Sequence, residues 1–204
     1  MTLTEWNPRR ADISWLTDEL ATGGDIQADH QLAALQCADL VAQGVTHVID
    51  CRLEFDDRAR MQRFAPSISY ARFGVDDKSG IEHTDDWWEA VYAHAQEALS
   101  VPGAKLFVHC HVGMNRGPSA AYMLLVSPLF RLTPAEAFDL VRRQRPIANM
   151  AYAEQGLTWL AKHDWSGVVE SDILRARGSH TWTQALTDEV NHRHRAKALG
   201  RFQP

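Results

Sequence analysis

The sequence predicts an α/β protein whose central, mostly parallel sheet is flanked by helices. Three observations predict this class: short apolar runs rich in β-branched residues, helical patterns that alternate with them, and one tight turn that leads from such a run directly into a helix. The chain has 204 residues, of which 45% are hydrophobic and 23% charged, a composition that supports one folded core. We expect one domain over residues 1–165 and a partly mobile helical extension over residues 166–204.

In the first half of the chain, a helix is followed by a strand, and a second strand is followed by a second helix. Asp29 is placed to cap the first helix, and Gly44 is placed to end it. The run after Gly44 is short and β-branched, as in a buried strand. Thr84 is placed to cap the second helix. In chain order, these elements are expected at residues 31–41, 45–50, 68–75 and 85–95.

The second half contains the strand that we expect at the centre of the sheet. Residues 105–109 form a short apolar run between glycine-containing turns, which is typical of a central parallel strand. Pro118 is tolerated only in the first turn of a helix, so the next helix begins around residues 116–119. Residues 133–136 combine a capping box with a proline at the first helical position. The last helices are expected over residues 119–126, 133–143 and 152–163.

Composition and charge exclude several kinds of partner and cofactor. The net charge is −5, so no general attraction to nucleic acid or to an anionic membrane is expected. Cys37, Cys51 and Cys110 form no short-spaced pair, which argues against a disulfide framework and a zinc site. The sequence shows neither an apolar run of about 20 residues nor a secretory signal. We therefore expect a cytoplasmic protein with reduced thiols and no cofactor or metal, and the oligomeric state stays open.

The stretch from His109 to Arg116 has the composition of an oxyanion trap. It lies between a predicted strand and a predicted helix, and five residues separate Cys110 from Arg116. Backbone N–H groups of a tight loop converge at a helix N-terminus, and an arginine adds bidentate donors for a tetrahedral oxyanion such as phosphate. The same field favours a thiolate, which makes Cys110 a nucleophile. Gly113 supplies the backbone freedom that such a turn needs.

This stretch resembles the signature of the cysteine-dependent protein tyrosine and dual-specificity phosphatases: His-Cys, five residues, Arg, with a glycine three positions after the cysteine. The resemblance covers about residues 13–162. It implies a dual-specificity phosphatase-like fold and hydrolysis of phosphotyrosine, and also of phosphoserine and phosphothreonine, in a phosphorylated protein. The implied reaction proceeds through a cysteinyl-phosphate intermediate and needs no metal.

The resemblance also assigns roles to individual residues. Cys110 is the nucleophile, Arg116 binds the phosphate, and Asp77, which follows the strand at residues 68–75, is the general acid. Asp76 is the alternative acid. The substrate-binding loop residues are His111, Val112, Gly113, Met114, Asn115 and Gly117.

Three further residues are expected to support the site. His109 is expected to be buried and to hydrogen-bond the loop. Ser119 is a candidate to assist departure of the thiolate, because Gly117 stands where the family usually has Ser or Thr. Cys51 follows the strand at residues 45–50, and the resemblance implies that it can protect an oxidised Cys110 through a disulfide. A small buried apolar side chain is the other reading of Cys51.

Other readings remain open at this point. We interpret the region around Arg52 as a solvated charged turn. A predicted helix C-terminus carries the charges of Arg142, Arg143 and Arg145. A rhodanese-like sulfurtransferase and a weakly active protein that binds phosphorylated partners are alternative functions. RNA and lipid phosphatases share such a loop, although residues 111–115 contain no lysine for a highly charged lipid headgroup.

Overall fold

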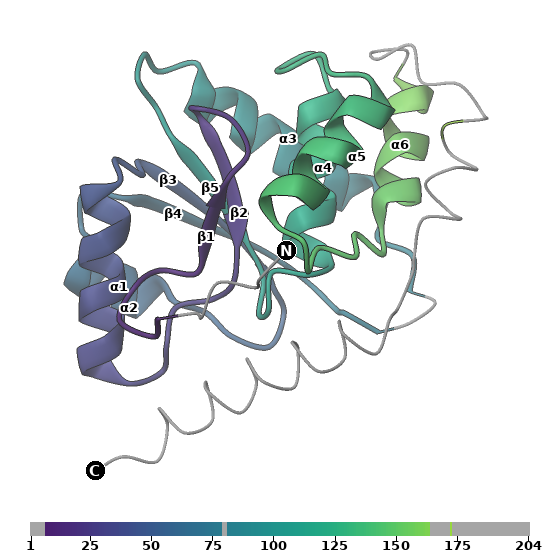
Figure 1. Cartoon of the computed structure of the whole chain (residues 1–204). Coiled ribbons are helices and arrows are strands. Elements are labelled where there is room, and N and C mark those ends of the chain that lie inside the picture. Colours follow the sequence, from purple (N-terminus) through teal and green to yellow (C-terminus); the bar gives the residue numbers. More distant parts are fainter. Residues whose placement is uncertain (1–6, 79–80, 164–171, 173–204) are drawn as a thin grey trace.

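The computed structural model describes residues 7–78, 81–163 and 172, and it contains a five-stranded mixed sheet in the order β1-β2-β5-β3-β4 (Figure 1). β1 pairs antiparallel with β2, and the other strand pairs are parallel. β5 lies at the centre, as the sequence predicts. The expected extension over residues 166–204 lies outside the described residues except for Asp172. The strands are β1 (Ile13–Trp15), β2 (Leu20–Gly23), β3 (His47–Arg52), β4 (Ser69–Val75) and β5 (Leu106–His109).

Two groups of helices cover the two faces of the sheet (Figure 1). Side chains alternate between the faces along a strand. Accordingly, Phe107 packs with α1 and α2, whereas its neighbours Leu106 and Val108 pack in the larger core with α3, α4, α5 and α6. The helices are α1 (His30–Ala42), α2 (Arg58–Phe64), α3 (Asp85–Leu99), α4 (Arg116–Val126), α5 (Pro134–Gln144) and α6 (Ala153–Lys162).

The predicted caps are confirmed in two of three cases. The Asp29 side chain accepts hydrogen bonds from two backbone amides at the start of α1. Thr133 and Glu136 form the expected capping box of α5. Thr84 is the N-cap residue of α3, but its side chain makes no capping hydrogen bond. Local chemistry therefore located these helix starts to within a residue.

Three short elements were not predicted: β1, β2 and α2. β1 has three residues and β2 has four, too few for an alternating pattern to be visible. α2 has seven residues and no side-chain cap. These elements exist because other elements pack against them: β2 pairs with β5, and Met61 of α2 lies in the core beneath α1.

The reading of Arg52 as part of a solvated turn is wrong. Arg52 is 1% exposed and donates hydrogen bonds to three carboxylates, those of Asp25, Asp50 and Asp57, none of them more than 5% exposed. The tertiary fold gathers these acids from separate segments. A buried guanidinium is stable there because its charge offsets theirs.

Replacing Arg52 with methionine is expected to lower the free energy of unfolding by about 3–5 kcal/mol, because buried carboxylates lose their counter-charge. Urea unfolding measures the change. Arg58→Met is the control: its side chain is 55% exposed and 4.0 Å from Asp56, so the loss should stay below about 1 kcal/mol. Equal losses in the two variants would contradict this account of the Arg52 cluster.

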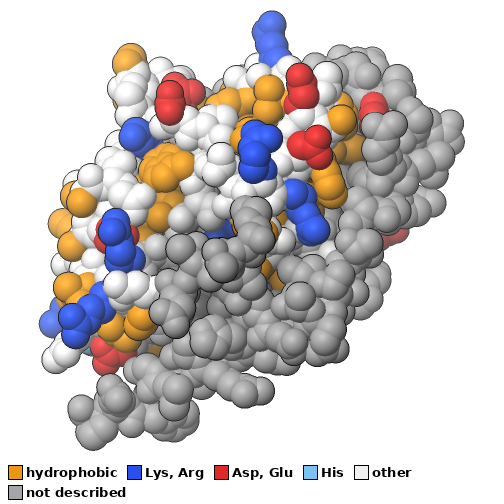
Figure 2. All heavy atoms as spheres, viewed as in Figure 1, with side chains coloured by type: hydrophobic (Ala, Val, Ile, Leu, Met, Phe, Trp, Pro, Cys, Tyr) orange, Lys and Arg blue, Asp and Glu red, His pale blue; other side chains and the backbone are white. Residues whose placement is uncertain are grey.

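Surface features agree with the modest net charge. On the face shown in Figure 2, the Lys and Arg side chains of the described surface are scattered among polar and apolar ones rather than joined in one basic patch. Within the described part of the chain, none of the helices has the length and apolar character needed to cross a membrane.

Candidate active site

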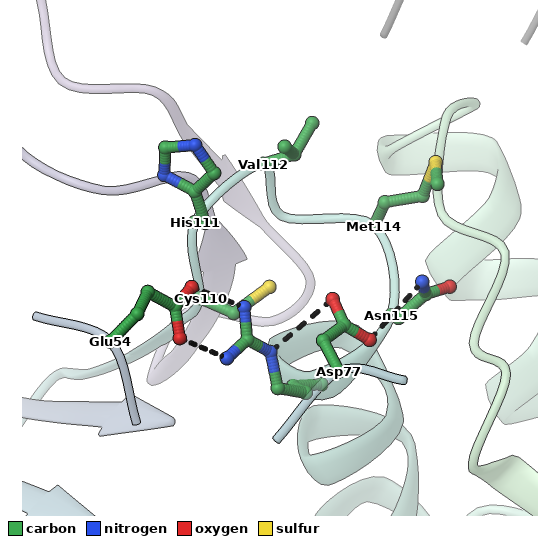
Figure 3. Close-up of a pocket in the computed structure, with 8 residues that line it drawn as sticks. Glu54, Asp77, Cys110, His111, Val112, Met114 and Asn115 are labelled. Carbon is green, nitrogen blue, oxygen red and sulfur yellow. Dashed lines mark hydrogen bonds and ion pairs between the residues drawn. The ribbon is translucent and has the colours of Figure 1, made fainter. Parts of the chain in front are cut away.

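The predicted oxyanion loop connects the C-terminal end of β5 to the first residue of α4. Cys110 and Arg116 are 1% and 2% exposed, and Gly113 has a φ of 70°, a left-handed conformation that favours glycine. The pocket in front of the loop is drawn in Figure 3. Its lining residues are Glu54, Asp77, Cys110, His111, Val112, Met114, Asn115 and Arg116.

Four consecutive carbonyl groups of the loop accept hydrogen bonds on the side of the loop that faces away from the pocket. The His111 carbonyl accepts from the Asp25 amide at 3.1 Å, and the Met114 carbonyl accepts from the amides of Asn149 and Met150 at 2.9 and 3.0 Å. Arg145 donates to the two carbonyls between them. Because the N–H of a planar trans peptide points opposite to its C=O, the amides of residues 112–115 face the other way, into the pocket. The loop thus presents a set of donors to one point, as an oxyanion requires.

Arg116 is positioned by the carboxylate of Glu54, a residue that no sequence motif marked as part of the site. Its two terminal nitrogens donate to Glu54 at 2.7 and 2.8 Å, and one of them also donates to the Val75 carbonyl. Burial would raise the pKa of Glu54, but the hydrogen bond from Arg116 holds it below its ordinary value. Within the described residues, the Arg116 Nε makes no hydrogen bond but forms an ion pair with Asp77 Oδ2 at 3.3 Å (Figure 3). An oxyanion bound at this donor would take the place of that carboxylate oxygen.

The structure separates the two candidate acids. Asp77 lines the pocket, and its Oδ1 accepts hydrogen bonds from the Tyr152 hydroxyl at 2.9 Å and from the side-chain Nδ2 of Asn115 at 3.4 Å. Burial and the charge of Asp77 raise the pKa of Tyr152, which therefore stays a donor. Asp76 does not line the pocket and pairs with Lys78 at 2.6 Å. The geometry favours Asp77.

The two histidines of the loop have different surroundings. His109 is fully buried, stacks on Phe107 and lies 3.3 Å from the Cys110 carbonyl oxygen. Burial lowers its pKa, so it is neutral at neutral pH. His111 lies at the pocket, and its Nδ1 is 2.6 Å from Asp25 Oδ2. These positions match the buried and the pocket-lining roles expected of them.

One group of described side chains has the composition of a metal site. The possible ligand atoms of Asp50, Asp57 and His109 lie within 4.8 Å of one another. Arg52 donates to both carboxylates of this group. A positive charge therefore already offsets these acids.

Gly113 and Gly117 belong to the loop region, but neither lines the pocket. A Cβ atom on Gly117 would lie 2.9 Å from the His109 carbonyl carbon and 3.0 Å from the Cys110 nitrogen. The first turn of α4 thus approaches the end of β5 too closely for a side chain. Ser119 is fully buried, and its hydroxyl oxygen accepts a hydrogen bond from the Tyr152 amide at 3.1 Å.

Gly117→Ser, which restores the residue usual in the resembling family, is expected to destabilise the protein by about 1–3 kcal/mol and to lower activity, because the added Cβ meets backbone atoms. Gly117→Ala adds the same Cβ without the hydroxyl and should cost a similar amount. Urea unfolding and phosphatase rates check both variants. A serine variant with full stability and faster turnover would refute this account of the glycine.

Arg145 lies at the C-terminal end of α5, as the sequence predicts, but its charge is buried and paired rather than exposed at the helix end. Arg145 is 3% exposed and forms a buried ion pair with Asp12 at 2.9 Å. Sequence patterns give no sign of this pair, because the two residues lie 133 positions apart. Glu54 was missed for the same reason, since it is 62 positions from Arg116.

The fold and this loop define the class of protein: a domain with the dual-specificity phosphatase architecture. No family model matches the chain. Among solved structures, human DUSP28 is 20% identical, with a TM-score of 0.58 over 75% of this chain and 95% of that one. Tk-PTP in its active form is 15% identical, with a TM-score of 0.56 over 74% and 95%.

A curated relative supplies the sequence comparison. The chain is 26% identical over 129 residues to the human dual specificity protein phosphatase 13B, a match that covers 60% of this chain and 63% of the relative. The chain therefore spans less than two thirds of that relative's length. The predicted resemblance to the dual-specificity phosphatases is therefore matched by one curated relative and by the fold of solved structures.

Proposed function

We propose that this protein is a cysteine-dependent phosphatase that hydrolyses phosphotyrosine, and also phosphoserine and phosphothreonine, in phosphorylated proteins. The observation that carries the proposal is the loop, in which Cys110 lies among inward-facing amides beside the Arg116 guanidinium. Such a ring of donors binds a phosphoryl group and stabilises the charge that develops on its oxygens. The similarity to a dual specificity protein phosphatase supports a phosphoprotein substrate.

The reaction has two steps. Cys110 Sγ attacks phosphorus, the bond to the leaving oxygen breaks, and protonated Asp77 gives its proton to that oxygen. A water molecule then gives a proton to the Asp77 carboxylate and attacks phosphorus, the S–P bond breaks, and phosphate leaves. Arg116 Nε and the loop amides bind the three non-reacting oxygens throughout.

Hydrolysis of p-nitrophenyl phosphate tests the proposal. We expect turnover that orthovanadate inhibits competitively, because vanadate has the geometry of the transition state. Absence of both turnover and vanadate binding would refute the proposal. Formation of thiocyanate from thiosulfate and cyanide would instead support the sulfurtransferase alternative. Parallel assays with a phosphotyrosine peptide, a 5′-phosphorylated RNA and an inositol phospholipid identify the substrate class.

A second candidate function is capture of phosphorylated partners with weak turnover. Two observations favour it: glycine replaces the usual hydroxyl residue at position 117, and the fold is shared with a human tyrosine phosphatase-like serine/threonine/tyrosine-interacting protein (16% identical, TM-score 0.56, covering 76% of this chain and 99% of that one). A burst of nitrophenol followed by a much slower steady rate would show that the phosphoenzyme accumulates. Fast turnover without a burst would contradict this second function.

We also propose that Cys51 is a resolving thiol for Cys110. β3 and β5 are parallel neighbours in which Asp50 pairs with His109. Cys51 on β3 and Cys110, directly after β5, each follow one residue of this pair. Burial and the proximity of Cys110 raise the pKa of Cys51, so it is protonated at rest. After peroxide oxidises Cys110 to a sulfenic acid, the Cys51 sulfur attacks the Cys110 sulfur, a disulfide forms and water leaves.

Mass spectrometry after mild peroxide treatment is expected to show a Cys51–Cys110 disulfide peptide, and dithiothreitol should restore activity. Cys51→Ser should abolish this recovery because the sulfenic acid then oxidises further. Cys37→Ser is the matched control, since Cys37 lies on α1 and is buried in the other core. Full recovery in the Cys51 variant would rule out the role.

A further inference from the structure

Arg145 lies behind the oxyanion loop and connects it to the N-terminal end of β1. It is the C-cap residue of α5. Its Nε donates to the Gly113 carbonyl, and one terminal nitrogen donates to the Val112 carbonyl at 2.9 Å. The terminal nitrogens also donate to both carboxylate oxygens of Asp12 at 3.1 and 2.9 Å. One planar side chain thus fixes two successive peptide groups of the loop.

Fixing a carbonyl also fixes the amide on the other side of the same peptide plane. With the Val112 and Gly113 carbonyls held by Arg145, the N–H groups of Gly113 and Met114 point away from it, toward the pocket. The carbonyls of His111 and Met114 accept from backbone amides, whereas the two carbonyls between them accept from the Arg145 side chain. Gly113, with its positive φ, is the residue of the loop whose adjoining peptides rotate with the least steric hindrance.

We propose that Arg145, anchored by Asp12, is a positioning residue that sets two of the inward-facing amides of the oxyanion loop. It acts without touching the substrate. The Asp12 carboxylate accepts from both terminal nitrogens and thereby fixes the guanidinium plane, and Ser14 Oγ lies 3.2 Å from one of these nitrogens. The role rests on the proposed function, because it concerns the donors that would bind the phosphoryl group.

Arg145→Lys is the sharpest variant for testing this role. Lysine keeps the positive charge beside Asp12, but it lacks the planar fork that reaches two carbonyls at once. Without that fork the inner peptides are free to rotate. We expect tungstate to bind about 10-fold more weakly, the effect of one net hydrogen bond, as measured by titration calorimetry. We expect kcat for p-nitrophenyl phosphate to fall by about 10²-fold, as when an oxyanion donor is lost, with a smaller change in KM.

Arg143→Lys is the matched control, because Arg143 is exposed on the same helix, and it should change neither quantity. If Arg145→Lys fails to fold, Asp12→Asn removes the bidentate anchor while keeping Arg145, and it should weaken tungstate binding in the same direction. A folded Arg145→Lys protein, or Asp12→Asn in its place, with wild-type tungstate affinity and kcat would overturn the positioning role. Failure of the wild-type chain to bind tungstate at all would instead overturn the proposed function.

Discussion

Replacing Cys110 with serine is expected to reduce the hydrolysis of p-nitrophenyl phosphate to the rate of buffer alone. A serine hydroxyl at this position is not ionised at neutral pH, so the group that attacks phosphorus is lost. The surrounding amides and Arg116 are unchanged, so tungstate should still bind. The Cys110→Ser protein should therefore separate binding from chemistry.

Initial rates and calorimetry on the same protein samples check this prediction. Cys51→Ser is the matched control, because Cys51 is as buried as Cys110 and lies on β3, the strand next to β5. This variant should retain activity under reducing conditions. Mass spectrometry of acid-quenched wild-type enzyme should show one added phosphoryl group, absent from the serine variant. Residual hydrolysis well above background in the Cys110 variant would assign the reaction to another nucleophile.

The second large effect is expected for Asp77→Asn. Asparagine cannot give a proton to the leaving oxygen, so hydrolysis of a phosphotyrosine peptide should fall by about 10²–10⁴-fold. The loss for p-nitrophenyl phosphate should be much smaller, because nitrophenolate leaves readily without a proton. This dependence on the leaving group identifies loss of a general acid and would not follow from loss of binding alone.

Asp76→Asn provides the control for the neighbouring carboxylate. Asp76 pairs with Lys78 away from the pocket lining, so its replacement should leave both rates within about 3-fold, the range of a surface substitution of about 0.5 kcal/mol. Steady-state kinetics with both substrates measure the two variants. If Asp76→Asn carried the larger and leaving-group-dependent loss, the assignment of the acid would move to Asp76.

Much of the fold followed from local chemistry. The capping box at Thr133, the cap at Asp29 and the apolar run before Cys110 predicted their elements, because the interactions that define them involve residues close in sequence. The spacing of Cys110 and Arg116 likewise predicted the oxyanion loop. β1 and β2 escaped notice because short strands are defined by the partner they pair with.

The same division applies to the site. A motif of eight consecutive residues contains the proposed nucleophile, the arginine and the glycine of the loop, so the sequence alone was enough to select them. The groups that orient them come from elsewhere: Glu54 for Arg116, Tyr152 for Asp77, and Arg145 with Asp12 for the loop itself. Each contact joins segments dozens of residues apart. Linear order carries the reactive groups, whereas the charges and donors that orient them meet only after the chain has folded, because hydrogen bonds and ion pairs depend on distance in space.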